Sequence, residues 1–68
     1  MKNDNLIISK NLKDLRIRNK LRQWQIAEYL EVERSTYAYY ELGKIRPDIY
    51  ALKKLADFYK IAIDDLFH

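Results

Sequence analysis

Cysteine is absent from this 68-residue chain, and histidine, glycine and proline occur once each. Without cysteine there is no disulfide framework and no thiolate metal site, and the lone His68 forms no ligand cluster. A Gly-rich phosphate loop is missing too, and the carboxylates of Asp64 and Asp65 are explained more simply as charges at a helix start. We therefore expect no metal, no cofactor, no small-molecule ligand and no enzymatic activity.

Long apolar runs are also missing. No segment is long enough to cross a bilayer, and the start, MKNDNLIISK, lacks the apolar core of a secretory signal. The chain is therefore expected to stay in the cytoplasm. Apolar residues make up 49% of the sequence, which suffices for the core of one small domain near the lower size limit for folding without disulfides or metals.

The net charge of +3 is modest, but it is unevenly distributed. Residues 1–22 contain seven basic and two acidic residues, or +5, whereas the remainder contains six basic and eight acidic residues, or −2. A basic stretch of this kind is commonly a solvated helix face. Beside a DNA-binding motif, the same charge would face phosphates.

Helical patterns begin after a polar start. Residues 1–8 are expected to form a flexible arm, and Ser9 is placed to cap a first helix that ends near Asn19. Leu12 and Leu15 would lie on its inner face.

Two short helices are predicted next, at residues 23–30 and 34–42. Gly43 would end the second of them, because glycine enters the left-handed conformation without strain. In the loop that follows, Pro47 bars a helix and Asp48 is available as the next cap.

A fourth helix is predicted at residues 49–59 and a short fifth helix in the tail IDDLFH at 63–68. Short helices joined by short loops predict an all-α fold of five helices, with a single domain at 9–68. The apolar stripe of the fourth helix would comprise Ile49, Leu52, Leu55, Ala56 and Tyr59.

The most informative stretch is QWQIAEYLEVERSTYAYYE, residues 23–41. It places two helical patterns on either side of a turn that is too tight for anything but a helix corner, and Ala27 would allow the two helices to approach closely. A corner with this spacing is a helix-turn-helix, whose second helix enters a DNA major groove. The apolar positions of the two helices are Ile26, Ala27, Leu30, Tyr37 and Tyr40.

The run from Leu12 to Phe67 resembles the phage-repressor-like helix-turn-helix family, also called the XRE or Cro family. The resemblance is carried by a series of short motifs in the same order and spacing as in the family. They are LKDLR at 12–16, Gln23, Ala27, LEV at 30–32, RST at 34–36, ELGK at 41–44, Pro47, LKKLA at 52–56 and IDDLF at 63–67. The resemblance implies binding to duplex DNA, usually as a homodimer on a two-fold symmetric operator, and regulation of transcription, most often repression.

The resemblance also implies a role for individual residues in DNA binding. Gln23 matches a glutamine that holds the DNA backbone from the start of the second helix, where the helix N-terminus itself attracts phosphate. Arg34 would make the sharpest base contact, because a guanidinium can bond guanine O6 and N7 together. The full predicted DNA-binding set is Gln23, Arg34, Ser35, Ala38, Tyr39, Lys44 and Arg46.

Several of these residues have plainer interpretations. Arg34 lies near Glu31 and Glu33, with either of which it could simply form an ion pair. Gln23 and Ser35 are ordinary surface residues in any small helical protein. For these positions, the family resemblance is what favours a role in DNA binding.

Other positions match structural features of the family. Arg16 and Glu41 correspond to a salt bridge that ties the first helix to the end of the recognition helix. Leu66 and Phe67 are predicted at a dimer interface, because related domains pair through the fourth and fifth helices, although Leu66 also fits the core.

The chain departs from the family pattern at exposed positions. Glu31 stands where glycine is common, and Leu42 replaces a polar residue that commonly touches phosphate. Trp24, with Tyr29 and Tyr50, adds aromatic side chains where polar ones are usual. These changes leave open an alternative function, a protein-interaction module such as an antitoxin or an antirepressor partner, with Trp24 at its contact surface.

Overall fold

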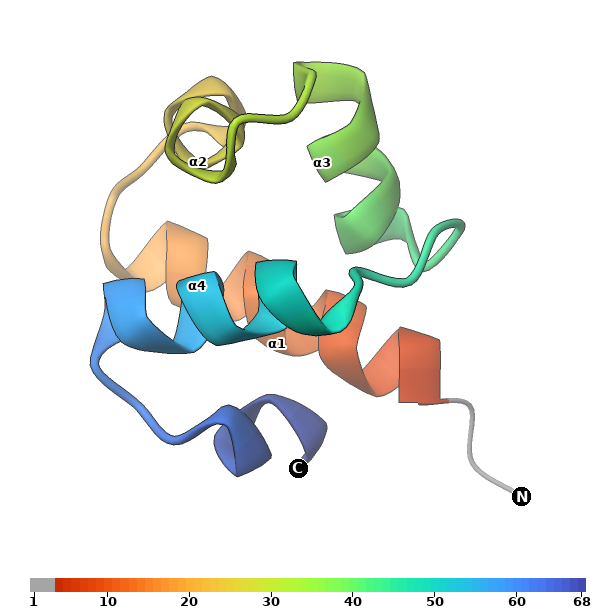
Figure 1. Ribbon diagram of the computed structural model, residues 1–68, viewed down its shortest axis with the longest axis vertical. Helices are drawn as coiled ribbons and strands as arrows, with labels where there is room; N and C mark the ends of the chain where they lie inside the picture. The colour runs from red at the N-terminus through yellow and green to blue at the C-terminus, as the bar shows by residue number, and fades with distance from the viewer. Residues whose placement is uncertain (1–3) are drawn as a thin grey trace.

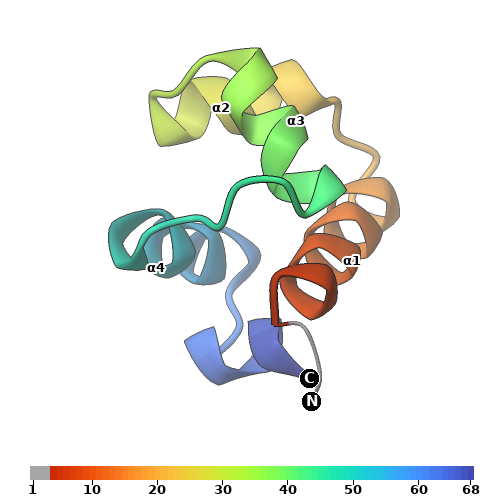
Figure 2. The same cartoon turned by 90° about the vertical axis from the view of Figure 1, so that its right-hand side faces the viewer.

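The computed structural model describes residues 4–68, which form four α-helices and a terminal 3-10 helix. Helices α2 and α3 lie together above a layer formed by α1 and α4, and the 3-10 helix η1 lies beneath that layer (Figure 1). In the view at right angles, α1 and α4 stand on opposite sides of the molecule, and α3 lies above them with its lower end towards α1 (Figure 2). The bounds are α1 Asp4–Arg18, α2 Gln23–Leu30, α3 Arg34–Leu42, α4 Ile49–Tyr59 and η1 Ile63–Phe67.

Local sequence signals account for the middle of the chain. The predicted bounds of α2, α3 and α4 agree with those observed. Gly43 ends α3 in the left-handed conformation, with φ of 76°. Asp48 caps α4, because its side chain accepts a hydrogen bond from the backbone N–H of Ala51 at 2.9 Å.

The first helix begins earlier than predicted. It starts at Asp4, so the flexible arm proposed for residues 1–8 is wrong for residues 4–8, while residues 1–3 lie outside the described part of the chain. The Ser9 hydroxyl does not cap the helix but donates to the carbonyl of Leu6 at 2.9 Å. Burial explains the extension, because Ile8 is completely enclosed by the core and the additional turn carries it there.

The predicted fifth α-helix is also wrong. Its residues form a 3-10 helix instead, and the fold over residues 4–68 therefore has four α-helices. The segment follows Lys60, which ends α4 in the left-handed conformation, and is too short to stabilise α-helical turns of its own. Packing holds it in place, since Leu66 is fully buried.

The core gathers one side of each element. Its members come from α1, α2, α3, α4 and η1, so the α2–α3 corner rests on α1 and α4, and η1 packs beneath those two helices. Ile49 is an exception to the predicted stripe of α4, because at the first position of that helix it is 62% exposed. The buried apolar residues are Ile8, Leu12, Ile26, Ala27, Leu30, Tyr37, Tyr40, Ala51, Leu52, Leu55, Ala56 and Leu66.

Among residues 4–68, no helix is long and apolar enough to span a membrane.

Candidate nucleic-acid interface

The corner between α2 and α3 is built by a short turn. Glu31 adopts the left-handed conformation, with φ of 61°, at the position where glycine is common in the family. The backbone N–H of Val32 then donates to the carbonyl of Ala27 at 3.0 Å, which closes the end of α2. Ala27 is buried and small, so α3 can pack closely against α2.

The outer face of α3 carries the predicted base-contacting residues. Arg34, Ser35 and Tyr39 are exposed, and Ala38 is half-buried between them. Within residues 4–68, Arg34 forms no ion pair with Glu31 or Glu33, which removes the plainer interpretation of this residue. Its guanidinium is therefore available to an external partner.

Lys44 adds positive charge beside this face. Its Nζ lies 5.9 Å from the centre of the Tyr39 ring, in a cation–π arrangement. The loop after α3 thus returns close to the outer face of the helix, with Lys44 beside Tyr39. Arg46 is exposed farther along the same loop.

The inner face of α3 is occupied by a hydrogen-bonded cluster centred on Glu41. Arg16 from α1 makes a bidentate contact with this carboxylate: its Nε donates to Oε2 at 2.6 Å and its Nη2 donates to Oε1 at 3.0 Å. The Tyr37 hydroxyl donates to Oε2 at 2.5 Å, and the Gln23 amide donates to Oε1 at 3.2 Å. The salt bridge that the resemblance implied is thus present between α1 and α3, and the hydrogen bond from Gln23 adds α2, so the Glu41 side chain joins all three helices.

Electrostatics keep this cluster charged. Burial alone would raise the pKa of Glu41, but the hydrogen bonds from Arg16, Tyr37 and Gln23 outweigh it and leave the pKa below its ordinary value. The bond to Glu41 raises the pKa of Arg16. Burial, followed by the bond to Glu41, raises the pKa of Tyr37. At neutral pH the carboxylate is therefore ionised and Tyr37 is its neutral donor.

Gln23 makes a contact within the protein that was not predicted from the sequence. This residue begins α2 as predicted, but it is half-buried and its amide is bonded to Glu41. An amide nitrogen carries two hydrogens, so one donor remains for a second acceptor. Gln23 therefore links the inner cluster to the exposed N-terminus of α2.

Two hydrogen bonds of the cluster were not predicted from the sequence. Tyr37 and Glu41 are four residues apart on one helix, so their contact was predictable from helical spacing. The contact between Gln23 and Glu41 joins residues on different helices, and nothing in the local pattern indicated it.

Tyr59 lies close enough to this cluster to be affected by its charge. Its hydroxyl is buried and, among the described residues, has no hydrogen-bond partner. Burial, helped by the negative charge of Glu41, raises the pKa of Tyr59 to about 12.

The remaining predicted positions divide between surface and core. Trp24 is 51% exposed and Leu42 is 61% exposed, so both present apolar surface to solvent. Phe67 is half-buried at the end of η1. The prediction of Leu66 at a dimer interface is wrong, because a side chain that is 0% exposed in the protomer has no surface to offer a second copy.

Comparisons with known proteins agree with this geometry. The family model described as helix-turn-helix matches residues 12–66. A cryptic phage CTXphi transcriptional repressor, RstR, from Vibrio cholerae is 35% identical over 60 residues, which cover 88% of this chain and 54% of the relative. The HTH-type transcriptional activator BcrR from Enterococcus faecalis is 36% identical over 58 residues, covering 85% of this chain and 28% of the relative.

A solved crystal structure of a transcriptional regulator from Listeria innocua superimposes with a TM-score of 0.86 at 40% identity, over 88% of this chain and 56% of that one. The chain spans about half the length of the repressor and of this regulator, and about a quarter of the activator. On the family match, the identities and the superposition, the chain belongs to the phage-repressor-like (XRE) helix-turn-helix family.

Proposed function

We propose that this chain is a sequence-specific, duplex-DNA-binding regulator of transcription that acts in the cytoplasm as a homodimer on a palindromic operator, most simply as a repressor. The observation that carries the proposal is the outer face of α3. Arg34 and Ser35 are exposed there and, within residues 4–68, make no side-chain hydrogen bond or ion pair. A helix face whose polar side chains make no such contact within residues 4–68 is suited to read base edges.

Each predicted contact has a place in this proposal. Arg34 reads guanine, and Ser35 and Tyr39 contact neighbouring bases or phosphates, with Ala38 leaving room for the bases. Lys44 and Arg46 bind the DNA backbone beside the groove. At the start of α2, the backbone N–H groups and the second amide hydrogen of Gln23 bind a phosphate, while Glu41 fixes the direction of that amide.

Regulation would follow from occupancy of the operator. In a homodimer, two α3 helices enter successive major grooves about one helical turn apart, and the bound protein blocks or recruits polymerase. Affinity would fall steeply with salt, because phosphate contacts release counterions. Two relatives are named as a repressor and an activator, respectively, which supports a role in transcription for the domain they share with this chain.

Selection of bound duplexes from a random DNA pool, at near-physiological salt, tests the proposal directly. The expected result is enrichment of a two-fold symmetric site with half-sites about ten base pairs apart. Retention of all duplexes alike, with no enriched sequence, would contradict a sequence-specific function.

A second candidate function is that of a protein-interaction module. Trp24 on α2 favours it, because half of this large apolar side chain is exposed, and Tyr50, 77% exposed at the start of α4, adds apolar surface elsewhere. If the selection enriches nothing, Trp24→Ser, with Tyr50→Ser on α4 as the matched control, would show whether a partner docks on α2. Loss of partner binding in the Trp24 variant alone would support this candidate.

A further inference from the structure

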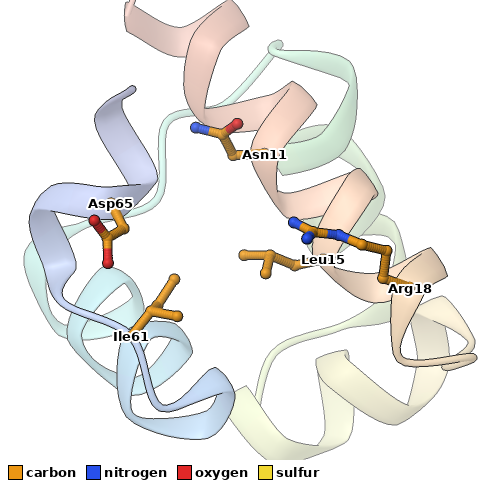
Figure 3. Close-up of a pocket in the computed structure, with 5 residues that line it drawn as sticks. All are labelled: Asn11, Leu15, Arg18, Ile61 and Asp65. Atoms are coloured by element: carbon orange, nitrogen blue, oxygen red, sulfur yellow. The ribbon is translucent and has the colours of Figure 1, made fainter.

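A cleft of about 200 Å³ lies between α1 and the segment that follows α4. It is lined by Asn11, Leu15, Arg18, Ile61 and Asp65 (Figure 3). Pockets for drug-sized ligands usually enclose about 300–1,000 Å³, so the cleft is small for such a ligand. The Asn11 amide donates to the carbonyls of Leu66 and His68, both at 2.9 Å. The cleft is therefore explained by the way in which the chain end packs against α1.

A contact between two exposed side chains, Tyr39 on α3 and Lys44 in the next loop, has no such explanation. The Lys44 Nζ lies 5.9 Å from the centre of the Tyr39 ring, within the range of about 6 Å for a cation–π contact. Within residues 4–68, Lys44 forms no ion pair and no side-chain hydrogen bond, so the ring is the partner of its ammonium group there. Because both side chains are exposed, their contact adds little to the packing of the core.

The backbone brings Tyr39 and Lys44 together. The carbonyl of Tyr39 accepts the backbone N–H of Lys44 at 3.0 Å and that of Ile45 at 3.4 Å. The loop then leaves the lower end of α3 and crosses towards α4 (Figure 2). On the side of α1, a Cβ atom at Gly43 would lie only 3.1 Å from the Leu6 side chain, so the turn is closely enclosed. The start of the Lys44 side chain is therefore fixed, and the Tyr39 ring holds its far end.

Confinement of this ammonium group matters for binding to DNA. A long lysine side chain loses rotamer freedom when it binds a phosphate, and this loss lowers affinity. A ring that already confines the ammonium group in the free protein reduces the loss. The ammonium group has three N–H donors, so donors remain for phosphate oxygens while one side of the group faces the ring.

We propose that Tyr39 is a positioning residue, which holds the Lys44 ammonium group beside the outer face of α3 for contact with one DNA phosphate. The inference rests on the proposed function and narrows the role of Tyr39 within it. Tyr39 acts through Lys44, in place of a direct contact with a base or a phosphate.

The contact itself can be measured by NMR in the free protein. Protons above the face of an aromatic ring are shielded, so the CH2 protons next to the Lys44 ammonium group should be shifted upfield in the wild type. The shift should persist in Tyr39→Phe, which keeps a ring, and disappear in Tyr39→Leu. Identical Lys44 resonances in the wild type and in Tyr39→Leu would overturn the inference.

Binding to the selected DNA separates the possible roles of Tyr39. For Tyr39→Leu, we expect affinity to fall by about two- to fivefold, the range for an exposed cation–π contact, and by the same factor for all single-base variants of the site. Tyr39→Phe should bind as the wild type does. A changed base preference in Tyr39→Leu would identify a base contact, and an equal loss in Tyr39→Phe would identify a contact of the hydroxyl group with phosphate. Either result would overturn the inference.

A double-mutant cycle between residues 39 and 44 is the decisive measurement. Lys44→Ala should reduce the slope of log affinity against log salt concentration by about 0.9, because one phosphate contact is lost. In this background, Tyr39→Leu should cause no further loss, since no ammonium group remains for the ring to hold. If the two losses multiply instead, the residues act independently and the inference is wrong.

Tyr50→Leu provides the matched control. It removes another exposed tyrosine, which makes no cation–π contact within residues 4–68, and should leave the Lys44 resonances unchanged. A loss of the upfield shift in Tyr50→Leu as well would show that the shift does not report on the Tyr39 ring, which would overturn the inference. Thermal melts of all variants would establish that each one folds.

Failure of this inference can be distinguished from failure of the proposed function. A wild-type protein that enriches no DNA sequence would overturn the proposed function, and the inference with it. A protein that enriches a site, but in which the losses at residues 39 and 44 multiply, would overturn the inference alone.

Discussion

The two faces of α3 differ in the contacts that their side chains make within the protein. On the inner face, Tyr37, Tyr40 and Glu41 are packed or hydrogen-bonded against α1 and α2, and the carboxylate of Glu41 alone accepts four hydrogen bonds. On the outer face, Arg34 and Ser35 make no side-chain hydrogen bond within residues 4–68. Residues of one short helix therefore serve different purposes. Substitutions on the inner face should change stability, and those on the outer face should change DNA binding.

Truncation of Glu41 should have the largest effect. Glu41→Ala leaves Arg16 partly buried without its partner and removes the acceptor of Tyr37 and Gln23. Breaking a buried pair in this way should lower the free energy of unfolding by about 3 kcal/mol. Denaturant unfolding would measure the loss.

The matched control for Glu41 is Glu28→Ala, which removes an exposed glutamate from α2 and should change stability by less than about 0.5 kcal/mol. If Glu41→Ala fails to fold, Glu41→Gln offers a milder test that keeps the shape of the side chain. Equal stability of wild type and Glu41→Gln would show that the inner face does not depend on this charge.

Acid should weaken the inner face through the same carboxylate. The pKa of Glu41 is lowered in the folded protein, so its contribution is fully present above the ordinary glutamate pKa and is lost as pH falls through the folded value. In the wild type, we expect the urea concentration at the midpoint of unfolding to decrease as the pH is lowered below about 4.5. The decrease should be shallower in Glu41→Gln. Parallel curves for the two proteins would exclude Glu41 as a source of acid sensitivity.

Arg34→Ala should act on the outer face alone. We expect it to relax base preference at one position of each half-site by about 2 kcal/mol, because a bidentate contact to guanine is lost. Stability should stay within about 0.5 kcal/mol of wild type, since the side chain is exposed. Competition binding with single-base variants of the selected site would measure the preference. A uniform loss of affinity for all sites would instead identify Arg34 as a phosphate contact.

Tyr59→Phe should increase the free energy of unfolding by removing an unsatisfied polar group near the inner face of α3. The substitution removes a buried hydroxyl that has no hydrogen-bond partner in the described part of the chain, and should stabilise the protein by about 1 kcal/mol. A second effect should appear in alkali. The raised pKa of Tyr59, about 12, means that its contribution to the free energy of unfolding falls as pH rises from about 10 to 12. The alkaline loss of stability should therefore be shallower in the variant, in which Tyr37 still contributes. A destabilised variant would indicate that the hydroxyl is hydrogen-bonded in solution.

Glu31→Gly should have the smallest effect and should leave both faces of α3 unchanged. Residue 31 holds a left-handed conformation, which glycine adopts without strain. Glycine also makes the unfolded chain more flexible, which offsets part of this relief, so the free energy of unfolding should rise by about 0.5 kcal/mol. Glu28→Gly, in the interior of α2, should have the opposite sign. If both glycines destabilise the protein, the turn is not strained by Glu31.

Features determined by neighbouring residues could be predicted from the sequence, whereas features determined by distant residues could not. Gly43 and Asp48 act within one turn of their own helices, and the bounds of α3 and α4 followed from them. The start of α1 could not be found in this way, because it depends on where Ile8 is buried in the assembled core. The same holds for the tail, whose place beside α1 is fixed by Asn11, 55 residues away from Leu66.

The same distinction applies to the contacts of the candidate site. The resemblance supplied the salt bridge between Arg16 and Glu41, and helical spacing could have supplied Tyr37. The bond from Gln23 to Glu41 required the positions of two helices in space and was not predicted, whereas the predicted contact of this amide with DNA stays a prediction. Roles of individual residues in DNA binding remain predictions, since they concern a partner outside the protein.

The sharing of Glu41 among three helices also bears on how such a domain diverges over evolutionary time. Arg16, Gln23 and Tyr37 all donate to one carboxylate, so replacement of any of them leaves the others with an altered acceptor. These positions are constrained to change as a set. Arg34 and Ser35 make no side-chain hydrogen bond within residues 4–68, so each can be exchanged alone, and under the proposed role in base reading such exchanges would change the operator while the scaffold stays the same.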